Sequence, residues 1–141
     1  MGTRAQIGVT QPNGTVRSIY VHWDGYLEGA GATLLRSYND PSPEGDALRT
    51  ALLDLGSLSS LGDKLVPDPG RPHSFDDPQV GVCVAYHRDR KEGGGPRVSV
   101  HGKDNWPDTW QVCEYLWEAG AWLWRHKGVT GHRWQPLALA L

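Results

Sequence analysis

The sequence predicts a single α+β domain with a mainly antiparallel sheet of about five to six strands and two short helices packed on one face. Three observations lead to this class. Strand-type runs rich in β-branched and aromatic residues lie toward both ends of the chain, two helical segments follow each other between them, and the 141 residues suit one domain spanning 1–141. The helices are expected at about 29–38 and 43–55.

The N-terminal segment predicts a β-hairpin. Residues 5–10 alternate apolar and polar types, and residues 16–23 are rich in β-branched and aromatic types. Between them, Asn13-Gly14 is a strong hairpin signal, because both central residues of a type I′ turn need positive φ. Alternation along the second strand places three apolar side chains on one face, namely Ile19, Val21 and Trp23.

The two predicted helices differ in how clearly they are delimited. The apolar stripe of the first consists of Leu34, Leu35 and Tyr38. The second has a well-marked start at Ser42-Pro43-Glu44, since Ser is a favourable cap, Pro fits the first turn and an acid suits this end of a helix. Gly56 is expected to end it. Its stripe, at i, i+3, i+4 and i+7 spacing, consists of Leu48, Ala51, Leu52 and Leu55.

The middle of the chain predicts a long irregular loop and further strands. Residues 57–79 are rich in Ser, Gly, Pro and Asp and show no sustained periodicity. Loops of this length in a compact domain are often functional. An apolar run at 80–86 predicts a strand, a charged segment follows at 87–92, and 97–101 predicts another short strand.

The C-terminal stretch 111–126 is compatible with either one helix or a β-hairpin. Its aromatic density and the central Glu118-Ala119-Gly120 favour two strands around a short turn. The apolar tail, 136–141, is expected to dock on the domain as a short helix or strap.

Composition and charge narrow the class of protein. The net charge of −2 and the pI near 6.3 argue against a general binder of nucleic-acid backbones, although not against a local basic patch. Neither Cys83 nor Cys113 belongs to a CxxC pair, and we predict no metal and no cofactor. No signal peptide and no apolar run of membrane-spanning length is visible, so we expect a cytoplasmic protein with free thiols.

Tryptophan dominates the aromatic residues. Seven Trp stand beside five Tyr and one Phe, and most of the Trp lie between residues 106 and 134. One interpretation is that they fill a core poor in Phe and Met. The other is that some of them form a stacking or protein-binding face, where Trp is enriched.

The densest cluster of polar and aromatic residues is His22-Trp23-Asp24-Gly25-Tyr26, where a strand leaves the sheet. In such a cluster His can serve as an acid or base, and Asp can orient it or bind a cation. The structural alternative is a turn at Asp24-Gly25, with His22 hydrogen-bonded and Trp23 in the core. The candidate binding residues here are His22, Trp23, Asp24 and Tyr26.

A second candidate, Arg88-Asp89-Arg90, also follows a strand directly. Two arginines flanking an acid can receive phosphate or carboxylate in bidentate fashion. The alternatives are a solvated, salt-linked turn, or a buried network in which Asp24 pairs with Arg88 or Arg90. The chain contains no phosphate-binding loop, zinc-protease or hydrolase motif, so the sequence does not predict an enzyme.

Four blocks of the sequence follow a recognisable pattern. They are Thr3-Arg4-x-x-Ile7-Gly8, Ser18-Ile19-Tyr20-x-His22-Trp23-Asp24-Gly25-Tyr26, Tyr86-x-Arg88-Asp89-Arg90 and Glu114-Tyr115-Leu116-Trp117. Through them the chain resembles a family of small proteins encoded by bacteriophages and prophages. The family's last block resembles an aromatic hairpin, which supports the hairpin at 111–126. The resemblance implies the cytoplasm of a bacterial host as the setting, and it implies no reaction.

Three hypotheses about function follow. The first is a non-enzymatic phage or prophage accessory protein that binds a host protein, such as an inhibitor of a defence or housekeeping complex. The second is a site for a nucleotide or similar anionic small molecule, with or without hydrolysis. In that site Arg88 and Arg90 would hold the anion, Trp23 or Tyr26 would stack, and His22 with Asp24 would be the acid–base pair. The third is a minor virion or structural protein.

Overall fold

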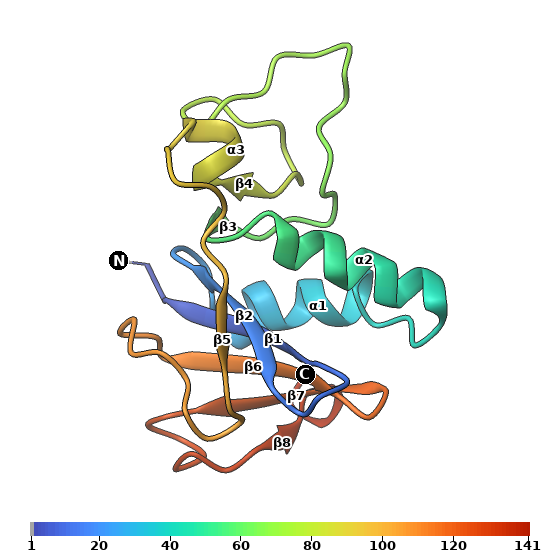
Figure 1. Cartoon of the computed structure of the whole chain (residues 1–141), viewed down its shortest axis with the longest axis vertical. Coiled ribbons are helices and arrows are strands. Elements are labelled where there is room, and N and C mark those ends of the chain that lie inside the picture. Colours follow the sequence, from blue (N-terminus) through green and yellow to red (C-terminus); the bar gives the residue numbers. More distant parts are fainter. Residues whose placement is uncertain (1) are drawn as a thin grey trace.

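A single mixed sheet organises the chain in the computed structural model, which describes residues 2–141 (Figure 1). Within those residues the sheet has eight strands, more than predicted. In chain order they are β1 Ala5–Thr10, β2 Val16–Val21, β3 Leu58–Ser60, β4 Val84–Ala85, β5 Ser99–His101, β6 Cys113–Glu118, β7 Ala121–His126 and β8 Gln135–Pro136. Their order across the sheet is β4-β3-β2-β1-β6-β7-β8, and β5 pairs with β2.

The sheet is mainly antiparallel, as predicted, but two of its pairings are parallel. These are β1 with β6 and β2 with β3. The parallel pairing of β1 joins the N-terminal hairpin to the C-terminal hairpin, and it places β1 in the middle of the sheet. At the start of both strands, Val112 N donates a hydrogen bond of 2.9 Å to Arg4 O.

The predicted hairpin of β1 and β2 forms, but its turn is not of type I′. Gly14 has φ +86°, whereas Asn13 keeps a negative φ. Gly14 N donates to Gln11 O at 2.9 Å, and Gln11 N donates to Thr15 O at 2.7 Å. These bonds define a three-residue loop in which a type I turn is followed by a left-handed glycine. Pro12 accounts for the difference, because its fixed φ near −65° suits the first central position of a type I turn.

Residues 111–126 contain the predicted β-hairpin. β6 and β7 pair from Cys113↔His126 to Glu118↔Ala121. Ala119 and Gly120 between them both have positive φ, at 51° and 81°. The type I′ geometry expected at the first turn is therefore found at this one.

The two helices predicted at 29–38 and 43–55 follow one another in the structure, and a further helix at Tyr86–Arg90 was not predicted. In chain order the helices and helical turns are the π turn η1 Leu27–Gly31, α1 Ala32–Ser37, α2 Pro43–Asp54, α3 Tyr86–Arg90 and the 3₁₀ turn η2 Leu137–Leu139. The start of α2 matches its sequence signal, since Ser42 Oγ accepts a hydrogen bond from Gly45 N at 3.4 Å and Pro43 lies in the first turn. Gly56, with φ +74°, follows its end.

The buried face of α2 differs from the predicted stripe. Leu48 and Ala51 are exposed, while Leu52 and Leu53 are buried. Arg49 is also buried, with only 1% of its surface exposed. A pattern that treats arginine as a surface residue therefore assigns this helix the wrong rotation about its axis.

Arg49 is accommodated by backbone carbonyls and an aromatic ring. Its Nη1 donates to Tyr38 O at 2.9 Å and to Asp40 O at 2.7 Å, and its Nη2 donates to Asp46 Oδ1 at 2.6 Å. Its guanidinium lies 3.5 Å from the centre of the Trp117 ring. These contacts replace much of the hydration that the buried cation loses.

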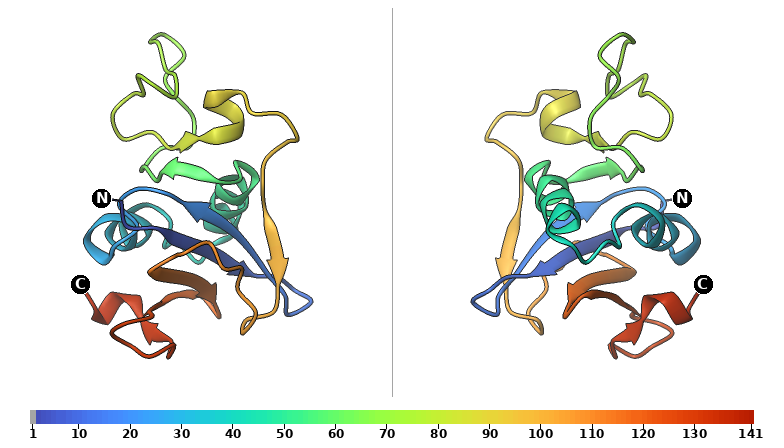
Figure 2. Two further views of the ribbon diagram at one scale, coloured as in Figure 1. Left: turned by 90° about the vertical axis from the view of Figure 1, so that its left-hand side faces the viewer. Right: turned by 90° about the vertical axis from the view of Figure 1, so that its right-hand side faces the viewer.

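One face of the sheet forms the hydrophobic core with α1, α2 and the C-terminal turn. Figure 2 shows η1, α1 and η2 on one side of β1 and β2, and β5 on the opposite side. The docking of the tail is confirmed, since Leu137 is fully buried. The core includes Ala5, Ile7, Ile19, Val21, Leu34, Tyr38, Leu52, Leu53, Tyr115, Trp117, Trp122, Trp124 and Leu137.

The other face of the sheet carries a buried polar layer. Gln6 Nε2 donates to Ser18 Oγ at 3.1 Å, and Arg125 pairs with Glu114 at 2.5 Å. All four residues are buried. The segment 102–111, which follows β5, covers this layer, and we call it the strap.

The predicted strand at 80–86 is largely wrong. Only Val84–Ala85 pair as β4, and α3 begins at the next residue. Val80 is 98% exposed and Gly81 has φ +79°, which breaks the extended run. Asp89 favours the helix start, because its Oδ2 accepts a hydrogen bond of 2.8 Å from Ala85 N. The irregular loop predicted at 57–79 contains the short strand β3, and the segment 61–83 after it is mostly irregular. This segment forms the upper end of the molecule in Figure 1. Across the described residues, each helix is too short or too polar to cross a bilayer.

Both cysteines should be chemically protected by the fold. Cys83 and Cys113 are free and buried. Burial raises the pKa of the Cys83 thiol, and it raises the pKa of Cys113 to about 11. Because the thiolate is the reactive form, we expect neither to react with a disulfide reagent at mildly alkaline pH until denaturant is added. Rapid labelling of either thiol in the native protein, followed by mass spectrometry, would contradict this.

Candidate functional site

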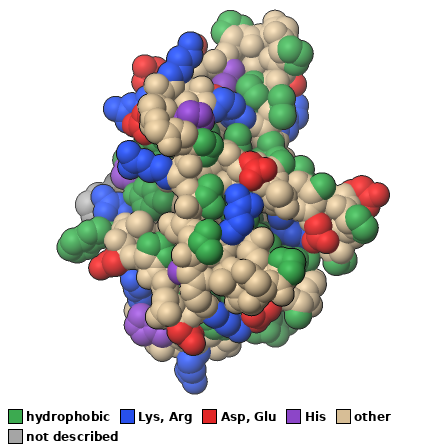
Figure 3. Space-filling model, in the orientation of Figure 1, with side chains coloured by type: hydrophobic (Ala, Val, Ile, Leu, Met, Phe, Trp, Pro, Cys, Tyr) green, Lys and Arg blue, Asp and Glu red, His purple; other side chains and the backbone are tan. Residues whose placement is uncertain are grey.

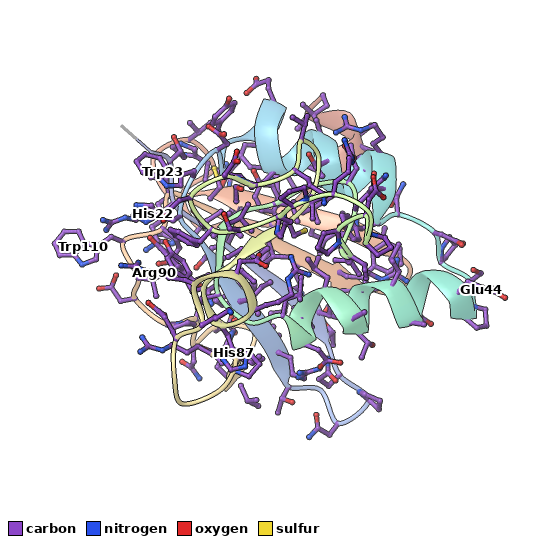
Figure 4. The ribbon with its side chains drawn as sticks, turned by 90° about the horizontal axis from the view of Figure 1, so that it is seen from above. His22, Trp23, Glu44, His87, Arg90 and Trp110 are labelled. Carbon is purple, nitrogen blue, oxygen red and sulfur yellow. The ribbon has the colours of Figure 1, made fainter. Side chains whose placement is uncertain are left out.

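Three strand ends meet at one end of the sheet. Arg4 precedes β1, His22 and Trp23 follow β2, and Trp110 lies just before β6. They converge because β1 runs parallel to β6 and antiparallel to β2. Figure 4 shows His22, Trp23 and Trp110 on the same side of the molecule. Together they form a hollow of about 450 Å³, which we call the aromatic hollow, lined by Gly2, Arg4, His22, Trp23, Trp110 and Val112.

His22 and Trp23 are held firmly although they lie outside the strand. His22 N donates to Leu58 O at 3.0 Å, and Trp23 N donates to Ser59 O at 2.9 Å. His22 Nδ1 is 2.6 Å from Tyr20 Oη, within hydrogen-bonding distance. The rings of His22 and Trp23 meet edge to face, with centres 4.6 Å apart. Trp23 is 45% exposed, so the alternative that placed it in the core is wrong.

Trp110 is the most unusual residue of the hollow. It is 79% exposed, and its φ of +62° is one that bulky side chains rarely adopt. Figure 4 shows its ring standing clear of the rest of the molecule. Such a backbone conformation costs about 1–3 kcal/mol and persists only where the surroundings impose it.

The neighbours of Trp110 impose that conformation. Gln111 Nε2 donates to Pro107 O at 2.6 Å and to Glu114 Oε2 at 2.8 Å, while its Oε1 accepts from Thr109 N at 2.8 Å. Thr109 Oγ1 also lies 3.2 Å from Gln6 Oε1. The residues on both sides of Trp110 are thus fixed to the polar layer, and the indole is directed outward.

Asp24 and Tyr26 adjoin the hollow without lining it. Asp24 is exposed with φ +58°, and its carbonyl oxygen accepts a hydrogen bond of 2.9 Å from Ala30 N. Tyr26 is 42% exposed and precedes η1. Gly25 between them packs closely, since a Cβ there would lie 2.5 Å from Ala5 Cβ. Asp24 makes no ion pair with Arg88 or Arg90, so the predicted network between the two segments does not form.

Arg88 and Asp89 are engaged with each other and with the backbone. Arg88 Nε and Nη2 donate to the two oxygens of Asp89 at 2.8 and 3.0 Å. Arg88 also donates to Leu65 O and to Cys83 O, the latter at 2.7 Å. These bonds tie α3 to the irregular segment before it. With its donors engaged inside the fold, Arg88 is not placed to hold an external anion.

Asp89 also faces a buried histidine. His73 Nδ1 accepts a hydrogen bond of 3.0 Å from Gln79 N, which leaves the proton of the neutral ring on Nε2. That atom lies 3.2 Å from Asp89 Oδ1 but is poorly aligned for a hydrogen bond. Both side chains are 4% exposed, so this pair belongs to the interior.

Arg90, in contrast, is exposed. It lies 5.2 Å from the centre of the Phe75 ring and 3.8 Å from Glu92 Oε1. Of the seven candidate site residues, the structure therefore brings His22 and Trp23 into one hollow. Asp24 and Tyr26 are exposed beside this hollow, and Arg90 is exposed at the end of α3. The side chain of Asp89 is buried against Arg88.

Two important residues of the hollow were missed by sequence reasoning. Arg4 belongs to the first block of the resemblance but was not selected as a site residue, and Trp110 was considered only as one of several tryptophans. Nothing local distinguishes Trp110 from the buried Trp117 or Trp122, because its exposure depends on the anchoring of the strap. Among residues 2–141, no three His, Cys, Asp or Glu side chains gather closely enough to hold a metal ion.

Comparison with family models, curated proteins and solved structures finds no match to this chain. The site is therefore assigned from its geometry.

Replacing Trp110 by glycine should stabilise the fold. Glycine adopts a φ of +62° without steric cost, and the exposed indole contributes little to the core, so Trp110→Gly should raise the free energy of unfolding by about 1 kcal/mol. Trp110→Ala keeps a Cβ at the same φ and should show no such gain. Urea unfolding followed by circular dichroism measures both variants. A glycine variant less stable than the parent would show that the indole supports the fold.

The ion pair of Asp89 should give the fold a defined dependence on pH. Burial alone would raise the pKa of Asp89, but hydrogen bonds from Arg88 and Ala85 N outweigh it and hold the pKa below its ordinary 3.8. Its contribution is therefore complete above pH 3.8 and is lost as the pH falls through the lower folded value. Asp89→Asn should cost about 3 kcal/mol at neutral pH, and the difference from the parent should shrink in acid.

Guanidinium unfolding at a series of pH values tests this. Asp68→Asn removes an exposed carboxylate paired with Arg71 and serves as the control, expected to cost less than about 1 kcal/mol. A loss for Asp89→Asn no larger than that of the control, or one independent of pH, would contradict the assignment.

Proposed function

We propose that this chain is a non-enzymatic binding protein whose partner, a protein, docks on the aromatic hollow. The observation that carries the proposal is Trp110, a large apolar side chain held outward by a strained backbone and two anchored neighbours. The strained backbone and the exposed indole both lower the stability of the fold. A favourable free energy of binding a partner at Trp110 explains why this arrangement is present.

The composition of the hollow supports a protein partner. It combines Trp23, Trp110 and Arg4, and Trp and Arg are the residue types that most often dominate the energy of protein interfaces. Their backbones are fixed before binding, which lowers the entropy lost on association. The hollow is also wide and open, which suits a protruding side chain of a partner.

The setting we propose is the cytoplasm of a bacterium that carries the phage or prophage, with a host protein as the partner. The support for this part is the resemblance carried by the blocks around Tyr20–Tyr26 and Tyr86–Arg90. By binding to a surface that a host defence or housekeeping protein uses for its own interactions, this chain would inhibit that protein. The anion-binding alternative loses support, because Arg88, one of the two arginines that were to hold the anion, is engaged inside the fold.

Capture from bacterial lysates tests the proposal. The immobilised protein should retain a partner in stoichiometric amount, and Trp110→Ala and Trp23→Ala should each reduce capture about tenfold or more at limiting concentration. Val80→Ala alters an even more exposed apolar residue outside the hollow and should capture as the parent does.

Thermal unfolding of each variant separates lost binding from lost folding. Capture that survives both Trp substitutions in folded variants would place the interface elsewhere. The lack of any stoichiometric partner across several hosts would count against a protein-binding role.

A further inference from the structure

Two further hollows lie next to the aromatic hollow. The first, of about 270 Å³, is lined by Gln6, Tyr20, Ser57, Arg97, Ser99 and Thr109. The second, of about 170 Å³, shares Tyr20, Ser57 and Arg97 with it and extends to Tyr86, His87, Glu92 and Gly95. We call these two hollows the basic groove.

Adjacent residues connect the basic groove to the aromatic hollow. Thr109 of the groove immediately precedes Trp110 of the hollow. Tyr20 of the groove contacts His22 of the hollow at 2.6 Å. Arg4 also acts across the junction: burial raises the pKa of Tyr20, and the charge of Arg4 partly offsets that rise. A ligand lying in one can therefore reach the other.

Two arginines without an ion-pair partner line these adjoining hollows. Neither Arg4, in the aromatic hollow, nor Arg97, in the basic groove, has a carboxylate within ion-pairing distance among residues 2–141. Arg90, which lines none of the three hollows, lies 3.8 Å from Glu92. Glu92 is also the one carboxylate among the described residues that line the three hollows. Figure 3 shows Lys, Arg and His side chains, with some Asp and Glu side chains among them, at the upper left of the molecule, around α3. The chain carries net charge −2, so this local excess of positive charge runs against its overall balance.

We propose that the partner presents an acidic linear segment, with a bulky apolar side chain in the aromatic hollow and carboxylates along the basic groove toward Arg97. This inference rests on the proposed function and adds the chemistry of the partner. Arg4 and Arg97 provide guanidinium donors for carboxylates, and such charge-assisted bonds are stronger than neutral ones. Charge complementarity of this kind also speeds association and selects the partner.

The arrangement favours a peptide over single-stranded nucleic acid. A nucleic-acid strand repeats a base and a phosphate at every unit, so its binding sites alternate stacking rings and cations along their length. Here the two exposed tryptophans lie together with Arg4 in the aromatic hollow, and among the described residues the basic groove beyond it is lined by Arg97 but by no tryptophan. Tryptophans that are confined to one hollow match a peptide better than a repeating strand, because the successive side chains of a peptide differ in kind.

Titration with synthetic peptides tests the inference. The probe carries a leucine pair followed by a run of glutamates, and its control has glutamine in place of each glutamate. Followed by fluorescence anisotropy of a labelled peptide at low salt, the glutamate probe should bind about tenfold or more tightly than the glutamine probe. Added salt should reduce the difference.

Protein variants locate the binding. Arg97→Ala and Arg4→Ala should each remove most of the preference for glutamate, whereas Trp110→Ala should weaken both peptides alike. Arg71→Ala neutralises an exposed arginine that lines none of the three hollows and should bind both peptides as the parent does.

Each other outcome overturns the inference. If both peptides bind with equal affinity and Trp110→Ala weakens both, the aromatic hollow is a binding site but the partner need not be acidic. Tighter binding of an oligothymidylate than of the glutamate peptide would replace the peptide with nucleic acid. If none of the probes binds, the proposal that the partner presents an acidic segment is wrong. The proposed function would still be supported if the parent, but not Trp110→Ala, captures a partner from lysate.

Discussion

The structure depends on one buried ion pair, Glu114 with Arg125, on the polar face of the sheet. Breaking such a pair by removing one partner typically costs about 3–5 kcal/mol, because the other charge is left buried and uncompensated. Because burial removes the water that would hydrate both charges, the pair is tolerated only where protein groups satisfy its remaining hydrogen-bonding sites. Gln111 donates to Glu114, His132 O accepts from Arg125, and the Trp134 ring lies 4.2 Å from the guanidinium. The strap and the segment after β7 supply these groups where they cover this face.

That requirement also explains the position of the candidate binding surface. Gln111 satisfies Glu114 only when the strap closes over the layer, and closing it forces the residue before Gln111 to turn outward. The exposed indole of Trp110 is in this sense a product of the interior polar layer beneath it. The candidate binding surface and the stability of the fold are thus coupled through the side chain of Gln111.

Local sequence signals predicted the parts of the fold that local energetics decide. The cap at Ser42, the turn at Ala119-Gly120 and the strand runs on either side of Pro12 were all recognisable without knowledge of the rest of the chain. Burial of Arg49 was not, because it depends on carbonyls and a ring from distant segments.

The candidate site was predicted only in part, for the same reason. His22 and Trp23 stood out as a dense cluster, but their companion Trp110 comes from a segment almost ninety residues later. Only the parallel pairing of β1 with β6 brings the two together, and such long-range pairing leaves no local pattern. Arg88 and Arg90 looked alike in sequence, yet one is held inside the fold and the other lies at the surface.

The meeting of three strand ends has a consequence for how the protein matures. The aromatic hollow combines residues from the first and last thirds of the chain, so a growing polypeptide on the ribosome cannot display it before β6 has emerged. Truncated products that end before the strap contain His22 and Trp23 but lack the opposite wall. Under the proposed function, binding is then reserved for completed molecules, and fragments would not compete with them for a partner.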